Sequence, residues 1–188
     1  MRKLLISLLA LALLFIPSPS RAQEEKPREL FSKAYALFSQ GDARLAEELF
    51  LRTLDKAFIL EDYSLYYLGL IAAKSENISS ARQYFSQLQQ KFPDSLWTPN
   101  AGLQLAKAAI AEKNYAEAIE LCRKLRSQRS KSEISDDAAY ILGQALEALG
   151  DLKQAHATYQ ELRRASPLSS PAAAARKAAA ALREKSSE

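Results

Sequence analysis

Few side chains of this 188-residue chain have the type and spacing that catalysis or metal binding requires. His156 is the only histidine, and the sequence around it offers neither a cysteine partner nor a Ser/Asp arrangement at catalytic spacing. The adjacent acids Asp136 and Asp137 stand where a helix is expected to begin, a place that favours negative charge. We therefore predict a surface or half-buried histidine, no metal site, no cofactor and no enzymatic activity.

The first 22 residues have the composition of an export signal. Arg2 and Lys3 precede an apolar run of 13 residues, and helix-breaking and small residues follow it up to Ala22. We predict a signal peptide over residues 1–22 and export, most simply to a bacterial periplasm. The alternative is a retained anchor, but 13 residues span only about 20 Å as a helix, against about 30 Å of hydrocarbon. No stable membrane span is expected after cleavage, and no cysteine stands near the cleavage point to accept a lipid.

Charge gives little reason to expect a polyanionic target. Removing residues 1–22 takes away three cationic side chains and no acid, so the formal charge falls from +4 to +1. Nucleic acid or an anionic membrane would need a concentrated cationic face, so we predict neither as a partner. The C-terminal end is locally basic, which we interpret as the solvated surface of an end helix. The basic residues there are Arg163, Arg164, Arg176, Lys177 and Arg183.

An internal repeat runs through the remaining residues. Four alanines stand 35, 37 and 37 residues apart, and each is followed four positions later by a larger side chain: Ala46 and Phe50, Ala81 and Phe85, Ala118 and Cys122, Ala155 and Tyr159. A unit of this length cannot bury its own apolar face and has to stack on its neighbours. Cys122, the only cysteine, falls on a core position and is expected to be buried.

Apolar residues recur at helical spacing and no stretch alternates with period two, so the predicted class is all-α. Turns are marked by the Gly-Asp pairs at 41–42 and 150–151, and helix starts by Thr98-Pro99 and Ser170-Pro171, each a cap residue followed by proline. We predict helices over residues 27–40, 43–57, 62–75, 78–91, 98–112, 115–129, 135–149, 152–165 and 171–184. Residues 23–26 and 185–188 are expected to be disordered tails.

The second and fourth units have the fullest motif. They carry Leu65, Leu68, Gly69, Ala72, Ala81, Phe85 and Pro93, and Ala139, Leu142, Gly143, Leu146, Ala155, Tyr159 and Pro167. This pattern resembles the tetratricopeptide repeat (TPR), which the first and third units match in part. The small residues Ala34, Gly69, Ala106 and Gly143 would let the paired helices approach closely. The resemblance implies a right-handed α-solenoid of about four helix pairs plus a C-terminal capping helix, over residues 27–184.

In TPR stacks the first helix of each pair lines a concave groove. Carried onto this chain, the groove positions hold Phe31, Tyr35, Phe38, Tyr63, Tyr66, Leu70, Asn100, Leu103, Lys107, Tyr140, Gln144 and Glu147. Such a lining suits an extended peptide or amphipathic helix of a protein partner, although several rings could instead be core between repeats. Replacing Tyr35 and Tyr66 by alanine is expected to abolish partner capture with little loss of stability. The Lys and Asn arrangement of a carboxylate clamp is absent.

Two segments carry a closer resemblance. Residues 60–69 and 92–97 are similar to the helical-repeat region of soluble lytic transglycosylases, and the Pro-Asp-Ser turn at 93–95 is shared with exported TPR proteins of cell division and with the β-barrel assembly lipoprotein. The Glu-Ser motif of a transglycosylase domain is missing, since Glu76 is followed by Asn and Glu133 by Ile. We therefore predict a non-enzymatic periplasmic scaffold in cell-envelope assembly. The alternative is the stand-alone repeat region of a lytic-transglycosylase-like system, which binds peptidoglycan or docks a catalytic subunit.

Overall fold

The computed structural model describes residues 26–54, 59–128 and 132–185. Every regular element in these ranges is an α-helix: α2 (Pro27–Gln40), α3 (Ala43–Leu54), α4 (Glu61–Lys74), α5 (Ile78–Lys91), α6 (Thr98–Ala111), α7 (Tyr115–Gln128), α8 (Glu133–Leu149), α9 (Leu152–Ala165) and α10 (Ser170–Lys185). The predicted helices are thus found: three have the predicted bounds, and the other ends that fall on described residues differ by at most two residues. The ends predicted at residues 57 and 129 lie outside the described residues. The predicted signal peptide and most of both predicted tails lie outside the described residues.

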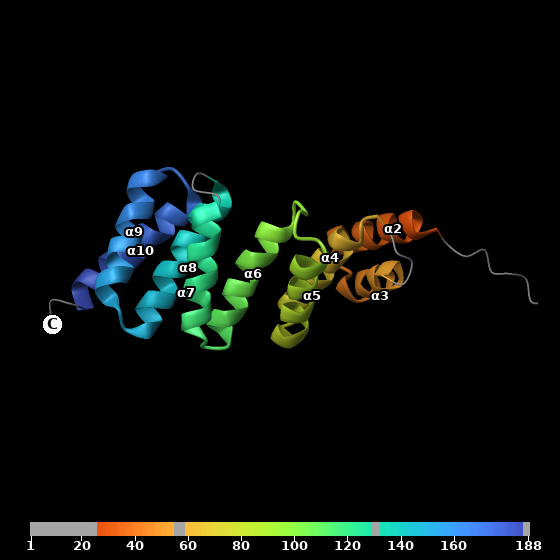
Figure 1. The fold of residues 1–188 in the computed structure, drawn as a ribbon, viewed down its shortest axis with the longest axis horizontal. Helices are drawn as coiled ribbons and strands as arrows, with labels where there is room; N and C mark the ends of the chain where they lie inside the picture. The colour runs from red at the N-terminus through yellow and green to blue at the C-terminus, as the bar shows by residue number, and fades with distance from the viewer. Residues whose placement is uncertain (1–25, 55–58, 129–131, 186–188) are drawn as a thin grey trace, which may run out of the picture.

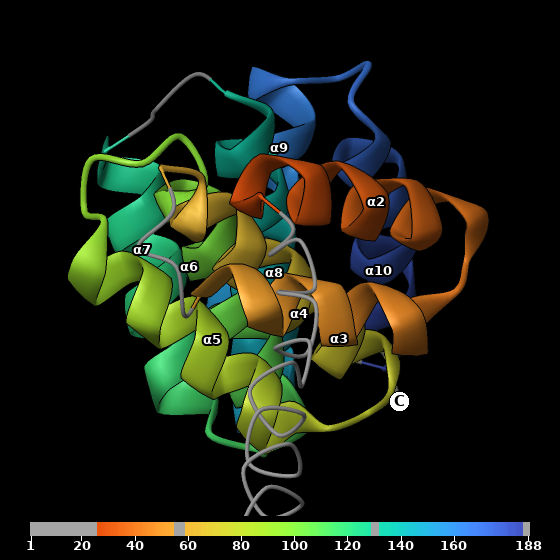
Figure 2. The ribbon, with the colours of Figure 1, turned by 90° about the vertical axis from the view of Figure 1, so that its right-hand side faces the viewer.

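The helices pair and the pairs stack along one axis (Figure 1). The pairs are α2 with α3, α4 with α5, α6 with α7 and α8 with α9, and α10 packs on both helices of the last pair. Figure 2 looks along the stack, with α2 and α3 in front of the later pairs. The all-α solenoid of four helix pairs and a capping helix is therefore confirmed. None of the described helices is both long enough and apolar enough to cross a membrane.

The residues that repeat in the sequence form the core of this stack. The four repeated alanines and the larger side chain after each are at most 1% exposed, and Cys122 is among them. Gly69 shows why one helix position must be small. A Cβ added there would lie 2.5 Å from Cε1 of Phe85, closer than two carbon atoms can approach without displacement. The packing roles predicted for the small residues are confirmed.

The turns inside the pairs all use a left-handed residue. Gly41 and Gly150 have φ angles of 89° and 91°, as their positions in the sequence predict. Glu76 and Lys113 take the same conformation in the second and third pairs, with φ angles of 58° and 60°. A side chain makes this conformation unfavourable by roughly 1–2 kcal/mol. No glycine marks these two turns, and the spacing of the repeat alone locates them.

Candidate partner-binding face

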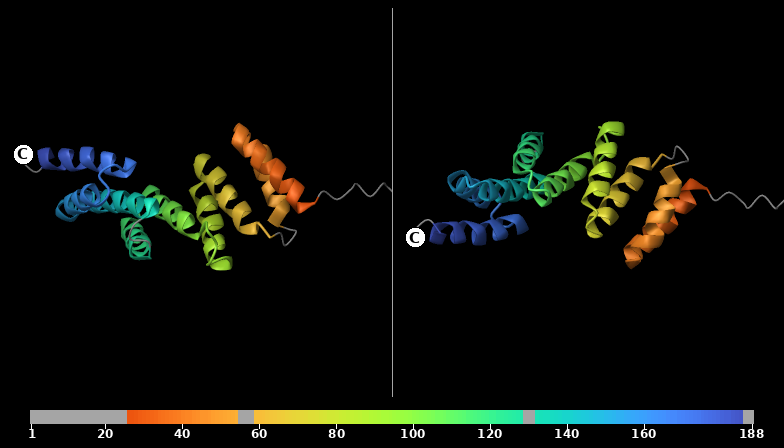
Figure 3. Two further views of the ribbon diagram at one scale, coloured as in Figure 1. Left: turned by 90° about the horizontal axis from the view of Figure 1, so that it is seen from above. Right: turned by 90° about the horizontal axis from the view of Figure 1, so that it is seen from below.

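The first helices of the pairs form one side of the stack. In Figure 3, α2 and α10 stand out on one side, α5 and α7 on the other, and α6 and α8 lie between them, so the first helices line a curved inner face. Two regions of this face are built differently. The aromatic cluster contains Phe31, Tyr35, Phe38, Phe50, Tyr63, Tyr66, Tyr67 and Trp97. The concave hollow is lined by Lys107, Ile110, Asp137, Tyr140, Ile141 and Gln144.

Tyr67 of α4 is the centre of the aromatic cluster. Its ring stacks on Phe50 of α3 with centroids 5.3 Å apart, and meets Phe38 and Tyr35 of α2 at 5.0 and 5.4 Å. Burial, with the neighbouring Tyr35 hydroxyl, raises the pKa of Tyr67 to about 12. Tyr67 thus joins the first two helix pairs through ring contacts. The groove positions of the TPR pattern skip this residue, so sequence reasoning missed it.

Tyr66 belongs to the core although it was predicted to line the groove. Its ring stacks on Trp97 with centroids 4.3 Å apart, its side chain is hydrogen-bonded to Asn100, and only 7% of its surface is exposed. Burial raises the pKa of its hydroxyl, and the bond to Asn100 opposes that rise. A Tyr66→Ala substitution is therefore expected to reduce stability, contrary to the expectation from the sequence.

The other predicted groove residues divide by exposure. Leu103 is buried beneath the face, while Phe31, Phe38, Tyr63, Leu70 and Tyr140 are half-buried and Tyr35, Lys107 and Gln144 are exposed. Tyr35, at 47%, is the most exposed ring of the cluster. The face therefore offers a partner the ring of Tyr35 and the edges of its neighbours at one end. At the other end it offers the concave hollow.

The concave hollow has a volume of about 390 Å³ and lies between α6 and α8. Three of its lining residues were predicted from the TPR positions: Lys107, Tyr140 and Gln144. Ile110 and Ile141 add an apolar floor, and Asp137 adds a carboxylate that sequence reasoning assigned to the helix start. Pockets of this volume with an apolar lining and a few polar groups hold one or two side chains of a ligand.

Charges of both signs border the concave hollow. Burial raises the pKa of Asp137, the Lys107 ammonium group lowers it, and the acids Glu133 and Asp136 raise it further. Lys107 is exposed, so its charge is available beside the apolar floor. The hollow can accept an apolar side chain and, at its rim, a polar group that pairs with either charge.

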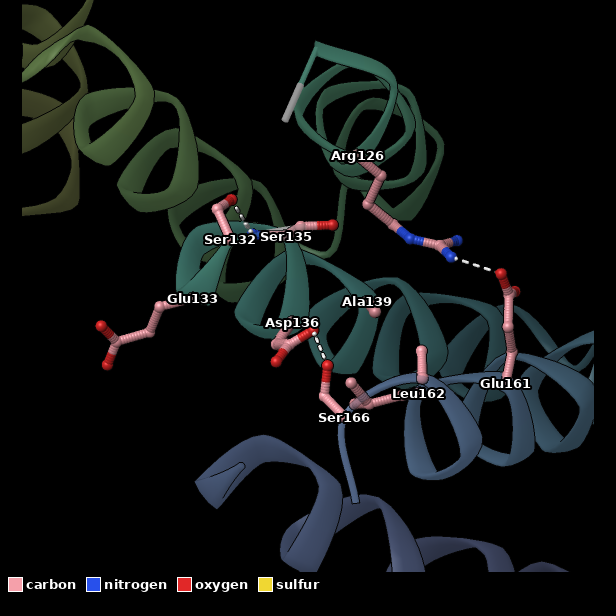
Figure 4. A pocket seen from close by; sticks show the side chains of 10 residues that line it. Arg126, Ser132, Glu133, Ser135, Asp136, Ala139, Glu161, Leu162 and Ser166 are labelled. Atoms are coloured by element: carbon pink, nitrogen blue, oxygen red, sulfur yellow. Dashed lines mark hydrogen bonds and ion pairs between the residues drawn. The ribbon is translucent and has the colours of Figure 1, made fainter. Parts of the chain in front are cut away.

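A larger hollow of about 610 Å³ lies away from this face, where α7, α8 and α9 meet (Figure 4). Several of its polar groups are bonded to one another. Arg126 pairs with Glu161 at 2.9 Å, and the Ser166 hydroxyl donates to Asp136 at 2.9 Å. The equivalent bond two helix pairs earlier runs from the Ser95 hydroxyl to Asp62 at 2.6 Å. The Arg126–Glu161 pair joins α7 to α9 of the next helix pair, whereas each Ser–Asp bond joins the turn after the second helix to the first helix of the same pair. We interpret these bonds as structural, because they hold neighbouring helices of the stack together.

Neither His156 nor Cys122 forms part of a reactive site. The His156 Nε2 atom lies 3.4 Å from Nε2 of Gln160, and the histidine is half-buried as predicted. Burial raises the pKa of the Cys122 thiol to about 12, which keeps it protonated. Within the described residues, no three His, Cys, Asp or Glu side chains are placed to hold a metal ion.

Comparisons with known proteins identify the repeat class. Residues 59–185 match the family described as YfiO, outer membrane lipoprotein. Similar solved structures include a tetratricopeptide repeat protein from Parabacteroides merdae, at 17% identity and a TM-score of 0.71 over 85% of this chain and 60% of that one. MamA from Desulfovibrio magneticus is 14% identical, with a TM-score of 0.67 over 87% of this chain and 96% of that one. PilF of Pseudomonas aeruginosa is 18% identical, with a TM-score of 0.63 over 80% of this chain and 66% of that one.

At these identities the solved structures show a shared fold alone, and that fold is the TPR solenoid. No curated protein sequence matches the chain. The match to the lipoprotein family covers three of the four helix pairs and the capping helix, so it includes the whole concave hollow.

Proposed function

We propose that this chain, which belongs to the YfiO family of outer membrane lipoproteins, is a non-catalytic scaffold that holds a protein partner on its concave face in the bacterial periplasm. The TPR fold supports binding of a protein partner, since such folds use the inner surface of the stack for recognition. The signal pattern of residues 1–22 and the family description support a place in the cell envelope, where the scaffold would serve assembly.

The concave hollow is the observation that carries this proposal. Side chains from two different helix pairs converge on it, and three of them occupy TPR groove positions. An amphipathic helix or extended segment would place one apolar side chain over Ile110 and Ile141, and a polar neighbour against Lys107 or Asp137. Further along the face, Tyr35 would provide a second apolar contact. The partner we infer is therefore a segment with two apolar anchors and a polar group between them.

Two exposed residues of the concave hollow allow a test that leaves the fold intact. Lys107→Glu combined with Gln144→Arg changes the charge and shape of the rim, and we expect capture of the partner by crosslinking from periplasm to fall at least about tenfold. Both side chains are exposed, so the thermal midpoint should stay within a few degrees of the parent.

The matched control is Lys124→Glu combined with Gln128→Arg, which makes the same two changes on exposed positions of α7. The proposal is contradicted if the control weakens capture of the partner as much as the variant in the hollow does. It is also contradicted if the variant in the hollow leaves capture unchanged. The chain can also be sedimented with purified murein sacculi. If it binds the sacculi and the same substitutions abolish that binding, the ligand of the hollow is peptidoglycan and not a protein.

A further inference from the structure

A second surface lies at the C-terminal end of the stack, between α9 and α10. Four polar or cationic side chains of α9 are spaced by three or four residues and share one side of that helix: Lys153, His156, Gln160 and Arg163. Arg176 and Arg183 are seven residues apart and share one side of α10. Arg183 and Lys153 line the same hollow, so the two rows border one furrow. We call these six residues the cationic seam.

On the α9 row, the hydrogen bonds formed among the described residues involve no acid. Arg163 donates from Nη1 to Oε1 of Gln160 at 3.1 Å, and Gln160 lies against His156, so the row on α9 is held together by neutral partners. Glu161, the one acid of α9, lies on another side of that helix and pairs with Arg126 of α7. Residues 152–185 contain seven Lys and Arg against two Asp and Glu, although the chain after residue 22 carries a formal charge of only +1.

Exposed leucines lie at both ends of the cationic seam. At one end, Leu152 and Leu182 form the apolar floor of a hollow of about 310 Å³ whose rim holds Lys153, His156 and Arg183. At the other end, Leu168 in the turn before α10 is 99% exposed, more than any other large apolar side chain of the described residues. The seam between them is about 15 Å long, from the rise of α9 between Lys153 and Arg163.

The low net charge of the chain predicted no anionic membrane partner, but the fold gathers its C-terminal cations along one furrow. We propose that the C-terminal end of this solenoid docks on an anionic phospholipid surface through the cationic seam and the leucines at its two ends. Cations on a protein surface are drawn to acidic headgroups, and isolated apolar tips gain by entering the interface beside them. An acidic protein would complement the charges but leaves Leu168 without an apolar surface to cover it. An anionic bilayer pairs with the cations and also covers the exposed leucines. The chain also belongs to a family of outer membrane lipoproteins. Docking by this end leaves the concave face open to its partner.

The test measures sedimentation of the chain without its predicted signal peptide, residues 1–22, with vesicles of phosphatidylcholine alone and of phosphatidylcholine mixed with phosphatidylglycerol. We expect binding to the mixed vesicles that weakens with added salt. Each cation removed near an anionic surface lowers binding about fivefold, so Arg176→Glu combined with Arg183→Glu should lower it at least about 25-fold. Leu168→Ser combined with Leu152→Ser should lower it several-fold. Omitting residues 1–22 keeps the apolar run at residues 4–16 from contributing to vesicle binding.

The control is Arg123→Glu combined with Lys124→Glu, an equal change of net charge on exposed residues of α7. It should leave binding within about twofold of the parent. Equal losses in the control and seam variants, or equal binding of the parent to both kinds of vesicle, would overturn the proposal. Binding to soluble polyglutamate without binding to mixed vesicles would overturn it as well and indicate an acidic protein partner. Circular dichroism of each variant confirms that the fold is retained.

Discussion

The two halves of the concave face place the same repeat position in opposite surroundings. Tyr66 and Tyr140 are separated by two units of 37 residues. Tyr66 is buried against Trp97, while Tyr140 is half-buried and lines the concave hollow. In the C-terminal half α6 packs on α8 and α8 on α10, whereas in the N-terminal half aromatic rings from α2, α3 and α4 fill the space between the helix pairs. The same position therefore supports the fold in one half and is available to a partner in the other.

The largest expected difference between the halves comes from removing these two rings. Tyr66→Ala takes away a buried, stacked ring and should lower the free energy of unfolding by about 3–4 kcal/mol. Tyr140→Ala removes a half-buried ring beside a hollow and should lower it by about 1 kcal/mol. Urea unfolding of both variants measures the two values. Equal losses would show that the two halves are packed alike.

Tyr66→Phe serves as the control for this pair. It keeps the ring on Trp97 and removes only the hydroxyl bonded to Asn100, so the loss should be about 1 kcal/mol or less.

A smaller difference is expected for two glycines at helix contacts. A Cβ at Gly69 would meet the ring of Phe85 at 2.5 Å, so Gly69→Ala should destabilise the fold by about 1–3 kcal/mol. A Cβ at Gly102 would meet the flexible Gln89 side chain at 3.0 Å, and alanine there adds helix propensity. Gly102→Ala should therefore change the free energy of unfolding by less than about 0.5 kcal/mol. Thermal unfolding of the two variants tests this order, and a greater loss at Gly102 would reverse it.

The smallest effect concerns pH in the aromatic cluster. The folded-state pKa of Tyr67 is raised from 10.0 to about 12, so its neutral form contributes stability below pH 10 that is lost as the pH rises from 10 to 12. Tyr67→Phe should reduce this alkaline loss, because phenylalanine has no proton to release. Denaturant titrations at a series of pH values measure the slopes, and identical slopes for the parent and Tyr67→Phe would contradict the expectation.

The sequence predicted the repeat architecture closely because its signals are local. The spacing of Ala46, Ala81, Ala118 and Ala155 fixes which residues face the partner helix within each pair, and all four are buried as expected. The turn at Lys113 was also placed correctly without a glycine, since the spacing of its neighbours leaves few alternatives. Helix type and pairing therefore follow from the residues of single units.

The binding face was predicted less well. Three groove positions converge on the concave hollow, but Tyr66 and Leu103 are buried, and Tyr67 and Asp137 were not foreseen at all. Helical periodicity indicates which side of a helix a residue lies on. It does not indicate how closely the next helix pair covers that side, which depends on contacts between residues more than 30 positions apart.

By itself, therefore, the sequence determined the four helix pairs, the capping helix and the small residues at which paired helices meet, because each of these depends on spacing within a unit. Only the tertiary structure decided which groove residues remain accessible and that cations of α9 and α10 lie along one furrow between exposed leucines. The physical reason is that each helix pair is rotated relative to the one before it. This rotation sets how exposed a given repeat position is and which side chains from distant parts of the sequence come into contact.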